Sequence, residues 1–204
     1  MTNQSQASTT MPRILYGTAW KKNDTARLVL QALRSGFRGL DTACQPKHYN
    51  EAGVGEGIAT FLQSSDVRRE DLYIQTKFTS VDGQNAKRIP YDPKLPLREQ
   101  VSASCAVSRK NLGVEVLDCL VLHSPMRTLE QTLMVWSAFE SLVHEGFVRT
   151  LGISNCYSLP TLRAVWEHAK IKPAVLQNRF YRNEGYNVSL RQFCKQMRIT
   201  YQSF

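Results

Sequence analysis

The sequence lacks any hydrophobic run long enough to cross a membrane, and its cysteines follow no paired pattern. A membrane-spanning helix needs about 20 consecutive apolar residues, and no apolar stretch among the 204 residues approaches that length. The first ten residues are polar and lack the apolar stretch of a secretory signal. The cysteines form no C-x-x-C pair and no Cys/His cluster, which predicts reduced thiols and no metal site; they are Cys44, Cys105, Cys119, Cys156 and Cys194. We therefore expect a cytoplasmic protein that does not enter a membrane.

Long runs of basic residues are also absent. The chain carries 26 Lys and Arg residues against 17 Asp and Glu residues, a net charge of +9, yet no basic run exceeds two residues. The sequence has neither an RNA-reading aromatic motif nor zinc-finger spacing. These absences argue against a nucleic acid partner. The excess positive charge suits a phosphorylated cofactor or a surface that keeps the protein in solution.

What the sequence does contain is a strict alternation of short strand-like segments and amphipathic helical segments. The predicted strands cover residues 13–17, 37–42, 72–77, 117–122, 148–153, part of 173–180, and 199–204. The predicted helices lie between Asp24 and Gly36, over 52–62, from Pro96 to Leu112, from Thr128 to Gly146, over 159–168 and over 188–197. This alternation is typical of a parallel sheet, in either a doubly wound fold or a (β/α)8 barrel. We expect residues 1–12 to be a disordered segment and residues 13–204 to form one domain.

Two further segments have more than one interpretation. Gly53, Gly55 and Gly57 fail the G-x-G-x-x-G spacing of a dinucleotide-binding turn and do not directly follow a strand. We expect these glycines to allow close helix packing or a tight turn. The segment 79–95 is long for a connection inside a compact domain, which fits either a lid over a site or surface disorder.

Polar residues stand at the same end of consecutive predicted strands. They are Asp41, Lys77, His123, Ser154, Asn155 and Gln177. In parallel β/α folds, the carboxyl ends of the strands and the loops that follow them form the active face. A single residue of this kind would be an ordinary turn or core residue. Several of them in register predict a catalytic site.

These residues belong to short motifs that resemble the aldo-keto reductase family. In chain order the motifs are Gly17-Thr18-Ala19-Trp20, Asp41-Thr42-Ala43, Tyr49-Asn50-Glu51, Val54-Gly55-Glu56, Thr76-Lys77, His123-Ser124-Pro125, Gly152-Ile153-Ser154-Asn155 and Gln177. They follow the family order from residue 13 onward. The resemblance implies an α/β fold of the TIM (β/α)8 barrel type with parallel strands.

The resemblance also implies a catalytic mechanism, namely NADPH-dependent reduction of aldehydes and ketones without metal or flavin. Tyr49 would give a proton to the substrate oxygen. Because the ordinary pKa of tyrosine, about 10, hinders proton transfer at neutral pH, Lys77 would favour the phenolate by its charge. Asp41 would pair with Lys77 and orient it. His123 would hydrogen-bond the carbonyl oxygen.

Binding residues follow from the same resemblance. Ser154, Asn155 and Gln177 would hold the nicotinamide carboxamide, which needs both donors and acceptors. Tyr201 aligns with the aromatic residue that stacks on the nicotinamide ring, and an ordinary strand aromatic is an equal alternative for this position. The remaining cofactor contacts would be Gly17, Thr18 and Asp41. The small-molecule carbonyl substrate would contact Trp20, Tyr49 and His123.

The chain departs from the family pattern in two places. Five residues, Cys44 to His48, separate the Asp41-Thr42-Ala43 motif from Tyr49, where two are common, and His48 is an alternative proton donor. The sequence also ends within the seventh predicted strand, so we expect a truncated barrel without its last helix, strand and helix. The family binds the cofactor phosphates with loops from that part. We therefore expect weak or absent NADPH binding, and an open barrel edge that a second copy of the chain could cover.

Two other functions stay open at this point. The cluster of Tyr49, Lys77 and His123 would also serve a redox-neutral enzyme, such as an isomerase or dehydratase, without cofactor. Alternatively, the chain is a truncated isoform or an interaction protein that uses its exposed strand edges and has no catalytic activity.

Overall fold

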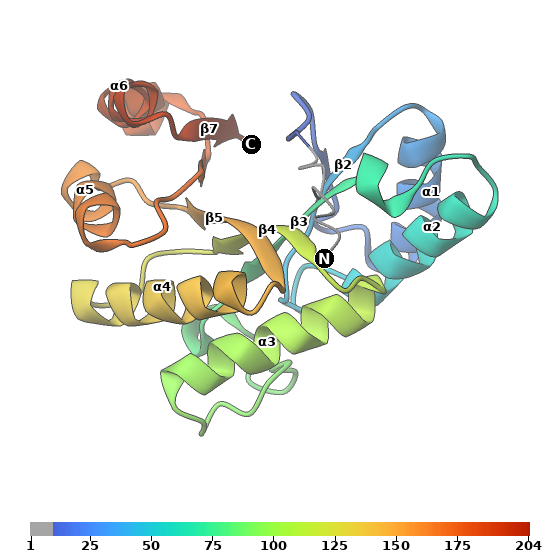
Figure 1. Ribbon diagram of the computed structural model, residues 1–204, viewed down its shortest axis with the longest axis horizontal. Coiled ribbons are helices and arrows are strands. Elements are labelled where there is room, and N and C mark those ends of the chain that lie inside the picture. Colours follow the sequence, from blue (N-terminus) through green and yellow to red (C-terminus); the bar gives the residue numbers. More distant parts are fainter. Residues whose placement is uncertain (1–9) are drawn as a thin grey trace, which may run out of the picture.

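The computed structural model describes residues 10–204 and contains one curled sheet of seven parallel strands. The order of the strands in space is their order in the chain. The strands are β1 (Tyr16–Gly17), β2 (Gly39–Asp41), β3 (Tyr73–Phe78), β4 (Leu117–Leu122), β5 (Val148–Ser154), β6 (Val175–Asn178) and β7 (Thr200–Ser203). Each connection between neighbouring strands contains a helix on the outside of the sheet (Figure 1). The helices are α1 (Thr25–Arg34), α2 (Glu51–Gln63), α3 (Leu97–Leu112), α4 (Leu129–His144), α5 (Leu159–His168) and α6 (Val188–Met197).

This architecture confirms the predicted incomplete (β/α)8-type barrel. The main difference concerns the first strand, predicted over residues 13–17. It is reduced to Tyr16–Gly17, because only these two residues pair with β2, which is itself three residues long. Of the segment predicted to be disordered, residues 1–9 lie outside the described residues. Met11, which follows them, packs against the inside of the barrel.

The two faces of the sheet differ in character. Along β4, Leu120 and Leu122 face the helices and join the large core that also contains Trp136 of α4. Cys119 and Val121 face inward and belong to a small apolar cluster inside the barrel. This alternation follows from the two-residue period of a strand. It leaves the inward positions nearer the carboxyl ends of the strands for polar side chains, and these build the candidate site.

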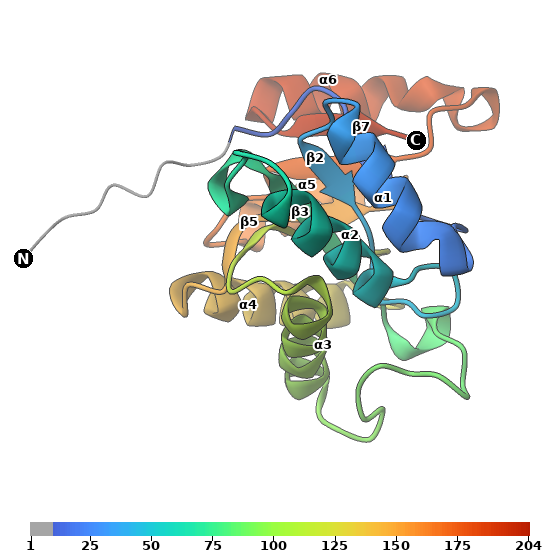
Figure 2. The same ribbon diagram turned by 90° about the vertical axis from the view of Figure 1, so that its right-hand side faces the viewer.

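The barrel wall is open between β1 and β7, which are the two edges of the sheet in residues 10–204. A cleft of about 650 Å³ lies there, lined by residues 11–15 on one side and 200–204 on the other. Figures 1 and 2 show β7 near the segment that precedes β1. Gln202 donates a hydrogen bond to the sulfur of Met11 across this gap (3.1 Å). The open edge expected from the sequence is therefore present in the described part of the chain.

Two features bear on the environment of the protein. Within residues 10–204, no helix is both long and apolar enough to cross a lipid bilayer. All five cysteines are buried as free thiols.

Glycines in α2 bring this helix into close contact with both neighbouring helices. A Cβ atom on Gly57 would lie 2.8 Å from the backbone oxygen of Ala26 in α1. A Cβ atom on Gly55 would overlap the backbone oxygen of Asn111 in α3. Because both obstacles are backbone atoms, a larger residue would have to move a whole helix. The expectation of close helix packing at these glycines is confirmed.

We predict that Gly55→Ala lowers the free energy of unfolding, although alanine is the better helix former. Alanine gains about 1 kcal/mol of helix propensity, but overpacking against the α3 backbone costs about 1–3 kcal/mol. Urea unfolding measures the net change, and Ala59→Gly on the exposed face of the same helix calibrates the propensity difference. A Gly55→Ala protein more stable than the parent would contradict the packing argument.

Candidate active site

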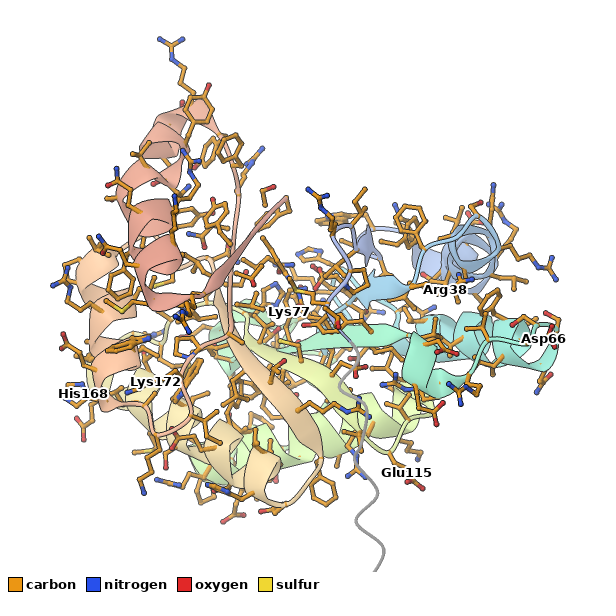
Figure 3. All side chains as sticks on the ribbon, turned by 45° about the horizontal axis from the view of Figure 1, so that its top comes forward. Arg38, Asp66, Lys77, Glu115, His168 and Lys172 are labelled. Carbon is orange, nitrogen blue, oxygen red and sulfur yellow. The ribbon has the colours of Figure 1, made fainter. Side chains whose placement is uncertain are left out.

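A buried ion pair lies at the centre of the barrel. Lys77 of β3 is 2% exposed, and its Nζ lies 2.7 Å from both carboxylate oxygens of Asp41, at the end of β2. Nζ also donates to the backbone oxygen of Thr42 at 2.8 Å. All three ammonium hydrogens therefore have acceptors, as a buried charge requires. Figure 3 shows Lys77 in the middle of the molecule, whereas Asp66, Glu115 and His168 lie near its periphery.

The loop between β2 and α2 places Tyr49 beside this ion pair. The backbone N–H groups of His48 and Tyr49 both bond to the carbonyl of Gln45 (3.0 Å each), which folds the loop into a turn. Asn50 then caps α2 by accepting from the N–H of Gly53 at 3.0 Å. As a result, the Tyr49 ring centroid lies 5.4 Å from Lys77 Nζ. The five residues before Tyr49 thus supply the turn that brings this ring to the ion pair.

The electrostatics of Tyr49 combine opposing effects. Burial raises the pKa of the phenol above its ordinary value, Lys77 lowers this pKa, and Asp41 raises it. The net shift is upward, so Tyr49 is a protonated phenol at neutral pH. The Lys77 ammonium donates its hydrogens to Asp41 and Thr42. It therefore acts on Tyr49 through its charge and not through a hydrogen bond.

His123, directly after β4, also lies close to Tyr49. The two ring centroids are 6.0 Å apart in an edge-to-face arrangement. His123 Nδ1 lies 2.6 Å from the hydroxyl oxygen of Thr79. Burial, together with the charges of Lys77 and His48, lowers the pKa of His123 to about 3. The imidazole is therefore neutral, and when the Thr79 hydroxyl donates to Nδ1 the ring proton resides on Nε2.

Polar residues at the ends of β5 and β6 form a second group. The Ser154 hydroxyl donates to the backbone oxygen of Gln177 at 2.7 Å. Asn155 donates to the backbone oxygen of His123 at 2.8 Å and lies 3.3 Å from the Ser154 oxygen. Asn155 adopts a φ of 50°, in the left-handed region that asparagine tolerates better than most residues. This conformation belongs to the turn that directs its side chain toward His123.

Two inward-facing glutamines, missed in the sequence analysis, connect the two groups. Gln75 donates to Asp41 at 2.7 Å and to the side-chain oxygen of Gln202 at 2.9 Å. Gln177 donates to the same Gln202 oxygen at 3.0 Å. A continuous hydrogen-bond network therefore runs from Lys77 to Gln177 through the barrel interior. The two-residue period of strands would have revealed Gln75, which precedes Lys77 by two positions.

The structure does not bring Tyr201 to this site. The Tyr201 ring packs against the core between the sheet and the helices, on the same side as Leu176, its partner in β6. The residue of β7 that faces the interior is its neighbour Gln202. By contrast, Gly17 and Thr18 do reach the site. Gly17 pairs with Asp41, and the Thr18 hydroxyl donates to the Asp41 backbone oxygen at 3.0 Å.

Trp20, predicted to contact substrate, lies at the mouth of the site. Its ring centroid is 3.9 Å from that of His48, and its backbone N–H donates to the His48 backbone carbonyl at 2.8 Å. Trp20 is nevertheless 66% exposed. This combination places a large aromatic surface in contact with solvent next to the loop that carries Tyr49.

The long segment 79–95 is fixed to the barrel. Tyr91 is buried, stacks on Phe78 (5.7 Å between ring centroids) and donates to the Thr79 backbone oxygen at 2.6 Å. Gln84 donates to the backbone oxygen of Cys44 at 2.8 Å. These contacts attach the segment to both the Thr79–His123 pair and the Tyr49 loop. Of the two interpretations from the sequence, an ordered cover beside the site fits these contacts.

The site therefore combines a tyrosine, a buried Lys–Asp pair and a neutral histidine at the carboxyl ends of the strands of a parallel β/α barrel. Comparison with known proteins identifies the family to which this arrangement belongs. The family model described as "Aldo/keto reductase family" matches residues 12–196. The chain belongs to this family.

Individual relatives show the extent of the match. The 9,11-endoperoxide prostaglandin H2 reductase of Trypanosoma cruzi is 32% identical over 195 residues, which cover 94% of this chain and 60% of the relative. The glycerol 2-dehydrogenase (NADP(+)) of Hypocrea jecorina is 32% identical over 193 residues, which cover 82% of this chain and 56% of the relative. The crystal structure of MGS-M4, an aldo-keto reductase from a deep-sea metagenome library, superimposes with a TM-score of 0.76 at 30% identity, over 95% of this chain and 64% of that structure. The chain therefore spans little more than half the length of these two curated relatives.

We predict that His123 stays neutral, in a single tautomer, between pH 5 and pH 8. Its pKa of about 3 lies far below the ordinary histidine value of about 6.5. Nitrogen NMR of the imidazole rings should show constant His123 shifts with the proton on Nε2. Thr79→Val should mix the two tautomers, whereas Thr79→Ser should preserve the single one. A His123 titration with a midpoint near pH 6.5 would contradict the burial argument.

The same pKa difference predicts how stability depends on pH. Because the folded-state pKa of His123 lies below the unfolded value, neutral His123 contributes its full stabilisation above about pH 6.5. This contribution should decrease as the pH falls from about 6.5 toward 3. Urea unfolding of the parent and of His123→Gln at pH 7 and pH 5 measures it. Equal losses in the two proteins over this interval would rule out a role for His123.

Proposed function

We propose that this chain catalyses the reduction of an aldehyde or ketone to an alcohol with NADPH, and that Tyr49 is the proton donor. The observation that carries the proposal is that Tyr49 lies close to both the Lys77–Asp41 ion pair (5.4 Å from its ring centroid to Lys77 Nζ) and neutral His123 (6.0 Å between ring centroids). Membership of the aldo/keto reductase family supports it. The relatives with NADP-linked names support the choice of cofactor.

The residues present fit the nicotinamide half of the cofactor. A carboxamide requires both donors and acceptors. The side chains of Ser154 and Asn155 lie 3.3 Å apart at the end of β5, where Ser154 pairs with Gln177 of β6. Gln177 uses one amide hydrogen on Gln202, which fixes the orientation of its side chain. When bound, NADPH supplies the hydride that reaches the carbonyl carbon. Gly17 and Thr18, which contact Asp41, would complete the cofactor-binding residues.

Tyr49 handles the proton in the proposed reaction. Negative charge develops on the substrate oxygen as its carbon is reduced, and the Tyr49 phenol gives that oxygen a proton. Burial alone would make the Tyr49 phenol a weaker acid than an ordinary tyrosine, since it raises the pKa. The charge of Lys77 counteracts burial by stabilising the phenolate that is left behind. Asp41 keeps Lys77 in place, although its own charge opposes the phenolate.

His123 provides orientation rather than a proton. With Nδ1 engaged by Thr79, Nε2–H is the donor available to the substrate oxygen. A neutral histidine donates a hydrogen bond to this oxygen without competing with Tyr49 for the role of acid. Polar donors of this kind stabilise charge that develops on an oxygen in the transition state. The low pKa of His123 therefore keeps His123 a neutral hydrogen-bond donor and leaves Tyr49 as the proton donor.

We predict that Tyr49→Phe reduces carbonyl-dependent NADPH oxidation by about 10²–10⁴-fold, the usual contribution of a general acid. The change keeps the aromatic ring and its packing and removes only the hydroxyl group. The initial rate with a simple aromatic aldehyde, followed by the loss of NADPH absorbance, measures the effect. Fluorescence titration with NADPH should give the same dissociation constant for parent and variant.

His48→Gln is the matched control, because His48 is the neighbouring alternative donor. We expect His48→Gln to change the rate by less than about tenfold, since Tyr49 remains. A large loss in His48→Gln together with a small loss in Tyr49→Phe would transfer the role to His48. Absence of any carbonyl-dependent NADPH oxidation by the parent protein would overturn the proposed reaction.

A further inference from the structure

A pocket of about 460 Å³ opens beside Tyr49. Three separate segments line it: the turn after β1, the loop that carries Tyr49, and the segment after β3. In Figure 2 the green segment after β3 lies beside the blue and cyan segments that follow β1 and β2. A volume of this size is within the range of small-molecule sites. We call it the Trp20 pocket, after the exposed aromatic residue in its wall.

The charge of the Trp20 pocket has one sign. Each segment contributes a cation, namely Lys22, Lys47 and Arg88, and no carboxylate is among the lining residues. In the part of the chain that the structure describes, none of these three cations lies within 4.0 Å of a carboxylate. By contrast, Arg127 on the same face pairs with Asp82 through two hydrogen bonds. The cations of the pocket are therefore available for an external anion.

Backbone conformation and hydrogen bonds fix the segments that line the pocket. Trp20 and Lys22 both adopt left-handed backbone conformations, with φ values of 64° and 50°. Conformations of this kind are uncommon for residues other than glycine and persist where surrounding contacts enforce them. Here the Trp20 backbone N–H donates to the His48 backbone carbonyl at 2.8 Å, and the Asn50 side chain donates to the Lys22 backbone carbonyl at 3.3 Å. These bonds hold the Lys22 and Lys47 segments against each other.

We propose that the Trp20 pocket binds an anionic group at the far end of the substrate, so that the preferred substrates are carbonyl compounds that carry a carboxylate or a similar anion. Trp20 and His48 offer two mutually tilted ring surfaces to the body of such a molecule, while Lys22, Lys47 and Arg88 supply the positive charge of the lining. The proposed reductase function places the carbonyl group at Tyr49, which lines the same pocket. The inference rests on that function for turnover, but the anion preference is a property of binding alone.

The test compares 4-formylbenzoate with 4-methylbenzaldehyde, which have similar shape and differ by one negative charge. Calorimetric titration without cofactor measures the binding of each compound. We expect 4-formylbenzoate to bind at least about fivefold more tightly at low ionic strength. The expected preference is this modest because exposed ion pairs are individually weak. Added salt should reduce this preference because it screens exposed charges.

Matched double variants separate the pocket from the overall positive charge. Lys47→Gln with Arg88→Gln removes two pocket cations and should abolish the preference. Lys21→Gln with Lys87→Gln removes the same charge from the adjacent positions, which are not part of the lining, and should preserve it. Lys21 instead lies over the Tyr16 ring, at 5.5 Å from its centroid. Circular dichroism and urea unfolding would check that both double variants are folded.

The outcomes distinguish this inference from the proposed reaction. Equal binding of the two aldehydes by the parent protein, or equal loss of preference in both double variants, would overturn the anion pocket. A preference confined to the intact pocket, without NADPH oxidation by either aldehyde, would support the pocket and overturn the reductase function. With turnover present, the ratio of kcat/KM for the two aldehydes should follow the ratio of their affinities.

Discussion

The buried ion pair between Lys77 and Asp41 is the constraint on which the rest of the site depends. An ammonium group that is 2% exposed is tolerated only because Asp41 and Thr42 accept all of its hydrogens. Loss of one partner from a buried pair of this kind typically costs about 3–5 kcal/mol. The strands β2 and β3 must therefore keep the register that brings these two side chains into contact. Tyr49, His123 and the interior glutamines are all positioned relative to that pair.

Much of this arrangement could be predicted because it follows from strand periodicity. Asp41, Lys77, His123, Ser154 and Gln177 lie near or just past the carboxyl ends of successive strands, although at different levels, since Asp41 pairs with Gln75 and Lys77 with Val121. Parallel strands bring such residues to one end of a barrel. The helices could be predicted equally well, since their apolar faces and caps are local features of the sequence. The bounds of β4, α5 and α6 match their predictions to the residue.

The remainder depends on contacts that no local pattern contains. A shift of one residue along a strand exchanges the inner and outer faces, and this is the difference between Tyr201, in the outer core, and Gln202, in the interior network. Thr79 reaches His123 only because the sheet sets the end of β3 beside the end of β4. The Trp20 pocket requires three loops that are far apart in the sequence. The direction of the β7 side chains and the convergence of distant loops therefore could not be predicted from local sequence patterns.

The hydrogen bonds between Gln75 and Gln202 have a consequence for how the molecule folds. They join residues that are 127 positions apart in the chain. Contacts of such large sequence separation form slowly, because the entropy of a long loop must be lost before they are gained. The earlier strands can assemble through contacts between neighbours, but the orientation of Gln75 against Asp41 is complete only when β7 has docked. The interior network is therefore complete only when β7 pairs with β6 and brings Gln202 to Gln75 and Gln177.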